Sequence, residues 1–135
     1  MSKHSGSCHC GEVTYSLCSE IVNVVNCHCN FCRSLNGSAF STYAALPYRS
    51  LKITRGRERL GCYQKKEGKK YFCSLCGTPI FNVNSRYPGA CMIYFGTLDE
   101  AQDIRPMINV WCESKLEWVD RVSSIRSVDR GVERK

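Results

Sequence analysis

The sequence lacks the long apolar runs of membrane-spanning proteins, although apolar residues make up 43% of its 135 residues. No stretch approaches the roughly 18 consecutive apolar residues that a transmembrane helix needs. The first residues, Met-Ser-Lys-His-Ser-Gly, are polar, so the pattern of a secretory signal is missing as well. We therefore expect a cytoplasmic protein that has no membrane partner and whose thiols stay reduced.

Helical periodicity is also scarce, and no repeat of fixed period divides the chain. A short helix over residues 31–35 and one turn over 98–102 are the only helical expectations. Segments rich in β-branched and aromatic residues predict strands over residues 12–17, 21–25, 39–46, 51–54, 58–64, 71–72, 79–83, 91–95 and 108–112. The expected fold class is mostly β, in small antiparallel sheets that leave room for only a thin core.

Cysteine, by contrast, is abundant. The eleven cysteines are an odd number, which fits poorly with complete disulfide pairing. In a reduced compartment, clustered cysteines indicate metal binding or catalysis rather than a disulfide framework. The formal charge of +7 suggests an acidic partner such as nucleic acid. That interpretation weakens because the deprotonated ligand thiols would remove more charge than two zinc ions add.

Four of the cysteines predict a closed metal site. Cys73 and Cys76 form a C-x2-C pair followed by glycine, and such a tight turn lets two thiolates bind one zinc ion. Cys8 and Cys10 can supply two further ligands, since their side chains share a face if the segment is extended. His9 then points the other way and is not expected to be a ligand. We predict a structural zinc on these four thiols, a geometry that iron can also occupy.

Three further cysteines predict an open metal site. Cys27 and Cys29 face together in an extended segment, and a turn starting at Asn30 can bring Cys32 to the same point. Three protein ligands with an open fourth position are typical of catalytic zinc. His28 points away from the thiols, and the other cysteines stand alone in apolar strands, where they act as small hydrophobic residues. The candidates for a fourth protein ligand are His28, Cys18, Cys62, Cys91 and Cys112.

The charge of the open site limits its chemistry. Zinc with three thiolates is net negative, which makes it a weak Lewis acid for water. It can still lower the pKa of a thiol that coordinates it. The site therefore predicts a thiol-dependent reaction, in which a substrate thiol is held as a nucleophilic thiolate, rather than simple hydrolysis.

Three cysteine motifs, over residues 6–13, 27–33 and 72–79, resemble the glutathione-dependent formaldehyde-activating enzyme family, which also includes centromere protein V. The segments 96–99 and 105–118 are similar to the C-terminal part of that family. Because the three motifs are well separated and each is specific, the chain is identified as a member of the family over nearly its whole length.

The resemblance implies a β-tent-like zinc-binding domain over residues 5–120, followed by a charged segment over 121–135 that is expected to fray. It also implies two zinc ions per chain, with the catalytic one on Cys27, Cys29 and Cys32. The family's reaction joins glutathione to formaldehyde and gives S-(hydroxymethyl)glutathione. We therefore expect a zinc-dependent enzyme of the carbon–sulfur lyase type that acts on thiol adducts and has glutathione as its small-molecule partner.

Two residues near these motifs bear on the substrate. Arg33 directly follows the last thiolate and could bind a carboxylate of a glutathione-like ligand, or instead face solvent or balance the charge of the zinc site. Family members often carry a histidine near the position of Asn109. Asparagine can hydrogen-bond but cannot shuttle a proton near neutral pH.

Other functions stay open at this point. A non-catalytic zinc module would contact nucleic acid or cytoskeletal polymers, although this chain has only a short charged tail for that purpose. A thiol sensor would use the three-thiolate site without turnover. The basic cluster over residues 65–70 lies between two predicted strands and fits a solvated hairpin turn. Its alternative role is an anion-binding rim.

Overall fold

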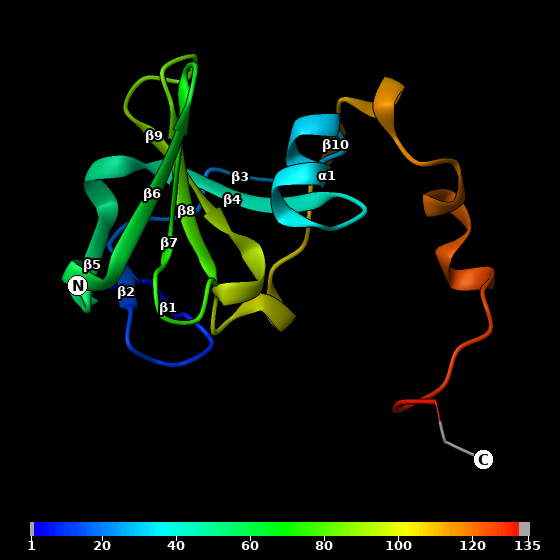
Figure 1. Ribbon diagram of the computed structural model, residues 1–135, viewed down its shortest axis with the longest axis horizontal. Coiled ribbons are helices and arrows are strands. Elements are labelled where there is room, and N and C mark those ends of the chain that lie inside the picture. Colours follow the sequence, from blue (N-terminus) through cyan, green and yellow to red (C-terminus); the bar gives the residue numbers. More distant parts are fainter. Residues whose placement is uncertain (1, 133–135) are drawn as a thin grey trace.

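The computed structural model describes residues 2–132, whose strands form two sheets (Figure 1). The mostly β prediction is confirmed. The smaller sheet has the order β1-β2-β5, with β1 (His4–Ser7), β2 (Thr14–Leu17) and β5 (Leu51–Arg55). The larger sheet has the order β10-β3-β4-β9-β8-β7-β6. Its strands are β3 (Asn23–Cys27), β4 (Ser41–Pro47), β6 (Leu60–Lys65), β7 (Gly68–Cys73), β8 (Pro79–Asn84), β9 (Ala90–Tyr94) and β10 (Ile108–Val110).

Helical structure is short, as expected. The one α-helix of the described residues is α1 (Asn30–Asn36), which contains the predicted helix. The expected turn over 98–102 is instead two 3-10 turns that lie on either side of Leu98. The 3-10 segments are η1 (Tyr48–Ser50), η2 (Arg57–Arg59), η3 (Phe95–Thr97), η4 (Ala101–Asp103), η5 (Cys112–Ser114) and η6 (Glu117–Ser124). None of these helices is long and apolar enough to cross a membrane.

Two sheet features were not predicted. Strand β1 has the polar sequence His-Ser-Gly-Ser, and its partner β2 holds it as a strand by antiparallel pairing. Gly6 in this strand lies against Tyr15, since a Cβ there would come within 2.2 Å of the Tyr15 hydroxyl. Strand β10 pairs in parallel with β3, whereas every other pairing between described strands is antiparallel.

The main core lies between the two sheets. Tyr15 and Leu17 of the small sheet pack with Leu46, Ile80 and Ile93 of the large one, and all five side chains are almost completely buried. Burial of this apolar area is the main favourable term for the fold, at about 25 cal/mol per Å². Because only one face of the large sheet is used in this core, its other face is free to form a site.

The lone cysteines behave less uniformly than expected. Cys91 is completely buried in the core, and burial raises the pKa of its thiol to about 12. Cys18, Cys62 and Cys112 are exposed, so the expectation that they act as small hydrophobic residues was wrong for these three. Cys18 directly follows β2 and Cys112 begins η5, whereas Cys62 lies in the edge strand β6, which is exposed on both faces from Cys62 onward.

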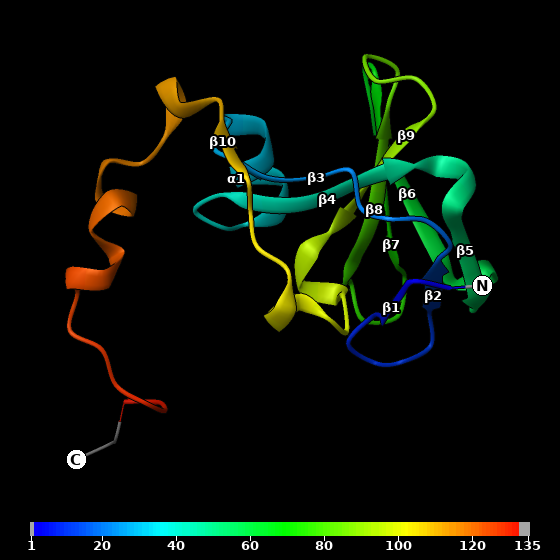
Figure 2. The same cartoon turned by 180° about the vertical axis from the view of Figure 1, so that it is seen from behind.

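After β10 the chain leaves the sheets and runs through η5 and η6 alongside the body (Figures 1 and 2). Trp118, Val122 and Ile125 of this segment are exposed. The expected domain boundary at residue 120 and the expected fraying beyond it stay predictions. Residues 133–135 of that segment lie outside the described residues.

Candidate metal centres

The first thiol cluster, here called the four-cysteine group, brings together Cys8, Cys10, Cys73 and Cys76, whose sulfur atoms all lie within 4.8 Å of one another. The Cys10 sulfur is 3.6 Å from that of Cys8 and 3.8 Å from that of Cys73. Four sulfurs this close form the donor set of a tetrahedral structural zinc site. The residues present therefore fit the metal that the spacing predicts.

Two different backbone turns bring these thiols together, one after Cys73 and one at Cys8 and Cys10. Cys73 ends β7, and the amide of Gly77 donates to the Cys73 carbonyl at 2.8 Å. Gly77 has a positive φ of 81°, which glycine adopts without strain. Cys8 and Cys10 were expected on an extended segment, and this prediction was wrong. They lie in a turn, in which the Gly11 amide donates to the Cys8 carbonyl at 3.1 Å. A turn brings the two thiols together as effectively as strand alternation would.

Hydrogen bonds stabilise the thiolate form of two members of this group, Cys8 and Cys76, whereas the pKa of Cys10 is raised to about 12. The amide of Val13 donates to the Cys8 sulfur at 3.3 Å. A hydrogen bond with the Thr78 hydroxyl, at 3.2 Å from the sulfur, lowers the pKa of the Cys76 thiol to about 5. Cys8 and Cys73 are buried, so their thiolates need a compensating cation, which a bound zinc ion would supply. His9 is exposed and is not part of the group.

The second cluster, the three-cysteine group, consists of Cys27, Cys29 and Cys32, again with sulfur atoms within 4.8 Å of one another. Cys27 ends β3, and Cys29 is the N-cap of α1. The Cys29 sulfur accepts a hydrogen bond from the Cys32 amide at 3.3 Å, which is the capping contact that starts the helix. The hydrogen bond from the Cys32 thiol lowers the pKa of Cys27 to about 6. No other Cys, His, Asp or Glu ligand atom of residues 2–132 joins this group.

A tyrosine supports the three-cysteine group from β4. The Tyr43 hydroxyl donates to the Cys32 sulfur at 3.1 Å, and the Tyr43 ring packs edge-on against Tyr94 with centroids 5.1 Å apart. Burial raises the pKa of Tyr94 to about 12 and raises the pKa of Tyr43 further. Both hydroxyls therefore remain protonated at neutral pH, so Tyr43 can donate to a thiolate.

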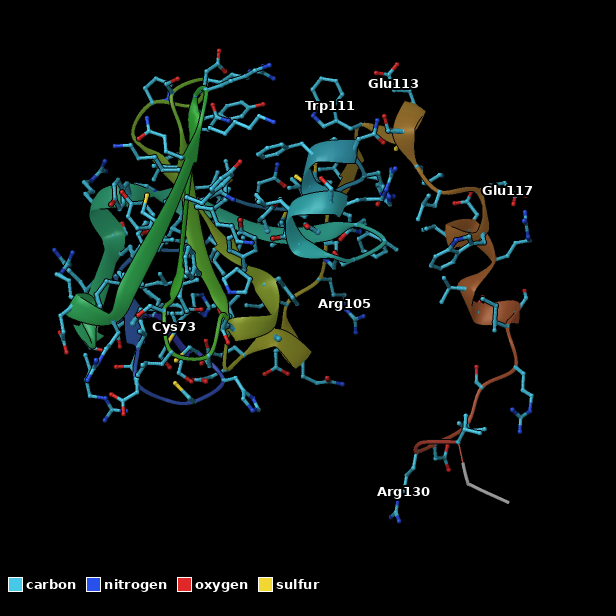
Figure 3. All side chains as sticks on the ribbon, viewed as in Figure 1. Cys73, Arg105, Trp111, Glu113, Glu117 and Arg130 are labelled. Atoms are coloured by element: carbon cyan, nitrogen blue, oxygen red, sulfur yellow. The ribbon has the colours of Figure 1, made fainter. Side chains whose placement is uncertain are left out.

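The three-cysteine group opens into a cavity of about 1090 Å³. The cavity lies over the face of the large sheet opposite the core, where the register aligns Val25, Tyr43 and Tyr94 in one row across β3, β4 and β9. Phe31 of α1 and Trp111, which lies beside α1 in Figure 3, contribute further walls. Cys73 of the four-cysteine group lies at the far end of β7 in the same view and does not line the cavity.

A sequence model of the family described as glutathione-dependent formaldehyde-activating enzyme matches residues 3–114. This chain belongs to that family. A curated protein of Halomonas elongata, which its name assigns provisionally to the glutathione-dependent formaldehyde-activating enzymes, is 25% identical over 123 residues, or 85% of this chain and 78% of that protein. The crystal structure of a Rhodobacter sphaeroides protein superposes with a TM-score of 0.64 at 25% identity, and the match covers 78% of this chain and 99% of that one.

Within this formaldehyde-activating family member, Arg33 has contacts that bear on its expected role. Its guanidinium donates to the backbone carbonyls of His28 and Ser114, the former at 3.2 Å and the latter at 2.5 Å, and to the Asn30 side chain at 2.7 Å. Arg33 is not among the described residues that line the cavity. These contacts brace α1 against the C-terminal part of the domain, and a substrate-binding role for Arg33 stays a prediction.

His28 and Asn109 lie behind the three-cysteine group. His28 is buried, packs on Phe40 with ring centroids 4.9 Å apart, and is not part of the group. Its Nε2 lies 3.3 Å from the Asn109 side-chain oxygen, which also accepts from the Asn26 amide at 3.0 Å. Asn109 thus joins β10 to β3 through its side chain.

The residues that surround the three-cysteine group in space could not be identified from the sequence. Tyr43 and Tyr94 were assigned only to strands, and Lys70 only to a charged turn. Strict alternation along the predicted strands would have put Tyr43 on the face opposite Ala44, but not next to Cys32. That contact depends on the pairing of β3 with β4 after the turn through α1.

Proposed function

We propose that the chain is a zinc-dependent enzyme of the carbon–sulfur lyase type, resembling S-(hydroxymethyl)glutathione synthase. It would add formaldehyde to glutathione and, in reverse, cleave the adduct. The observation that carries the proposal is the three-cysteine group, which faces a cavity with three thiols and no fourth protein ligand among residues 2–132. Family membership and the name of the Halomonas elongata relative support the choice of substrates.

The two thiol groups would hold the two zinc ions in different roles. Cys8, Cys10, Cys73 and Cys76 would saturate a structural zinc, whereas Cys27, Cys29 and Cys32 would hold a catalytic one. When bound there, the catalytic zinc would lower the pKa of a substrate thiol, so that the sulfur is present as the thiolate near neutral pH.

The reaction then needs few groups. The substrate sulfur donates an electron pair to the carbonyl carbon of formaldehyde and forms the carbon–sulfur bond. The π electrons of the carbonyl move to oxygen, which takes up one proton in place of the proton that the thiol released. Reversal breaks the same bond and returns the proton to sulfur, so no oxidant or reductant is required.

The protein's own residues would hold the reactants and protect the site. Tyr43 donates its proton to the Cys32 sulfur in a hydrogen bond and so keeps that ligand oriented and anionic. Phe31 and Trp111, both partly exposed, give the cavity apolar walls against which the substrate can pack. We also propose that the protein acts in the cytoplasm, where its free thiols stay reduced.

A comparison of three proteins tests this function: wild type, Cys29→Ser, and Cys62→Ser, which removes an exposed thiol outside both groups. Each is incubated with glutathione and ¹³C-formaldehyde, and adduct exchange is followed by NMR. We expect catalysed exchange in the wild type and in Cys62→Ser, and loss of catalysis in Cys29→Ser. Exchange at the uncatalysed rate in zinc-loaded wild type would refute the proposed function.

A further inference from the structure

The cavity of the three-cysteine group has one strongly basic wall. Five cationic side chains and one carboxylate line it, and the carboxylate, Glu67, lies 3.7 Å from the guanidinium of Arg86. These residues come from the hairpin of β6 and β7 and from the loop after β8. We call the five cations the basic wall; they are Lys65, Lys66, Lys69, Lys70 and Arg86.

Lys70 is the least exposed member of the basic wall: it is partly buried, whereas the other four cations are exposed. Its ammonium donates to the Leu35 carbonyl at 3.2 Å and to the Asn36 side-chain oxygen at 3.0 Å, and it lies 5.7 Å from the centre of the Tyr94 ring. It has no carboxylate within 4.0 Å among the described residues, and burial lowers its pKa. An ammonium has three donor hydrogens, so one remains for a ligand.

A short hydrogen-bond chain connects this lysine to the thiols. The Asn36 amide nitrogen lies 3.4 Å from the Tyr43 hydroxyl, which itself donates to the Cys32 sulfur. Lys70 is therefore separated from the three-cysteine group by only two side chains, Asn36 and Tyr43. Lys65 closes the same side of the cavity, with its ammonium 5.9 Å from the centre of the Phe31 ring.

We propose that the basic wall is a carboxylate subsite, in which Lys70 contacts a carboxylate of the thiol substrate and thereby selects anionic thiols. The assignment deepens the proposed function and rests on it, because it supposes that the substrate sulfur lies at the three-cysteine group. A peptide spans about 3.5 Å per residue, so the carboxylates on either side of a cysteinyl thiol are close enough to the sulfur for both ends to be bound in one cavity.

Charge explains why such a subsite is needed. Three thiolates around one zinc ion leave a net negative centre, which repels an anionic substrate. The cations of the basic wall offset that repulsion and orient the substrate so that only its sulfur approaches the centre. A thiol without carboxylates gains nothing from the basic wall, so the same arrangement discriminates against small neutral thiols.

Binding of S-methylglutathione to the zinc-loaded protein tests the subsite without turnover, because the methylated sulfur cannot react. Titration calorimetry compares this ligand with its dimethyl ester, which lacks both carboxylate charges. We expect the diacid to bind at least about tenfold more tightly than the diester, the effect of one charge-assisted hydrogen bond. Equal affinities would overturn the proposal.

Three lysine variants locate the contact. Lys70→Met should weaken binding of the diacid about tenfold and leave the diester unchanged, whereas Lys70→Arg should retain most of the preference. Lys52→Met removes an exposed lysine of β5 that does not line the cavity and should have no effect. A diacid preference that survives in Lys70→Met would exclude Lys70 as the contact.

Lys70 also holds the end of α1, so its removal could disturb the helix. The exposed pair in Lys65→Ser/Lys66→Ser avoids this problem and should reduce the diacid preference and its salt sensitivity. An unchanged preference in both this variant and Lys70→Met at all salt concentrations would place the carboxylate elsewhere. Because these are binding measurements, their outcome is independent of the adduct-exchange test. A diacid preference without catalysed exchange would refute the proposed function, and catalysed exchange without a diacid preference would refute the carboxylate subsite.

Discussion

The two thiol groups use the same ligand type in opposite ways. The four-cysteine group joins residues far apart in the chain, since Cys10 and Cys73 are 63 positions apart. The three-cysteine group comes from one six-residue segment at the end of β3 and the start of α1. The first group ties the loop after β1 to the turn before β8, and the second presents sulfur to a cavity. Thiols from distant parts of the chain stabilise the fold when they share a metal ion. Thiols from one short segment are not needed for that purpose, so their metal can face a cavity and take part in a reaction.

The largest expected effect comes from breaking the four-cysteine group. Cys73→Ser removes a completely buried ligand and should destabilise the protein by on the order of 5 kcal/mol or more, because binding of a structural zinc supplies folding free energy. This is comparable to the whole stability of a domain of this size. Urea denaturation followed by circular dichroism measures it. A cooperative transition with an unchanged midpoint would contradict the structural role of this group.

Breaking the three-cysteine group should leave the fold intact. Cys29→Ser is expected to fold, with a loss of about 1 kcal/mol, because serine is also a good N-cap for α1. Metal analysis should give one zinc per chain instead of two. A Cys29→Ser protein that unfolds like Cys73→Ser would remove the distinction between the two groups.

Acidification should empty the two groups in order. Zinc binds the thiolate, so protons compete with the metal as the pH falls toward the thiol pKa. Hydrogen bonding lowers the pKa of Cys27 to about 6 and that of Cys76 to about 5, whereas the pKa values of Cys10 and Cys32 are raised. The three-cysteine group has one thiolate ligand fewer than the four-cysteine group, so it should release zinc first between pH 7 and 5. A chromogenic chelator follows the release. Simultaneous loss of both ions from the wild type would contradict this order. So would release of the single zinc ion of Cys29→Ser at the pH at which the wild type loses its first ion.

The smallest effect is expected for Tyr43→Phe. The variant keeps the ring packing on Tyr94 but removes the hydrogen bond to the Cys32 sulfur, and it should weaken zinc binding at the three-cysteine group about tenfold. Competition with a chelator of known affinity measures the change. Tyr94→Phe is the matched control, because its hydroxyl contacts Asn82 and no thiol, and it should bind zinc as the wild type does.

The separate cysteine motifs could be predicted from the sequence because each is short and its geometry is set locally, and the two distant pairs could be joined because a structural zinc ion needs four ligands. The C-x2-C turn at Cys73 and the cap at Cys29 need only their own neighbours. The surroundings could not be predicted, because Lys70 of β7 comes near Tyr43 of β4 only through the sheet order β4-β9-β8-β7, in which β4 and β9 are far apart in the chain. Strand β1 was missed for a related reason: its polar residues have low strand propensity, and its partner holds it in place.

The parallel pairing of β10 with β3 also gives the site an order of assembly during synthesis. All four ligands of the four-cysteine group have been made once the ribosome reaches residue 76. The strand that ends in Cys27 gains its outer neighbour only when residues 108–110 have emerged and the Val110 carbonyl can accept from the His28 amide, at 3.0 Å. The ligand thiols of both groups are therefore made before the strand that completes the edge behind Cys27.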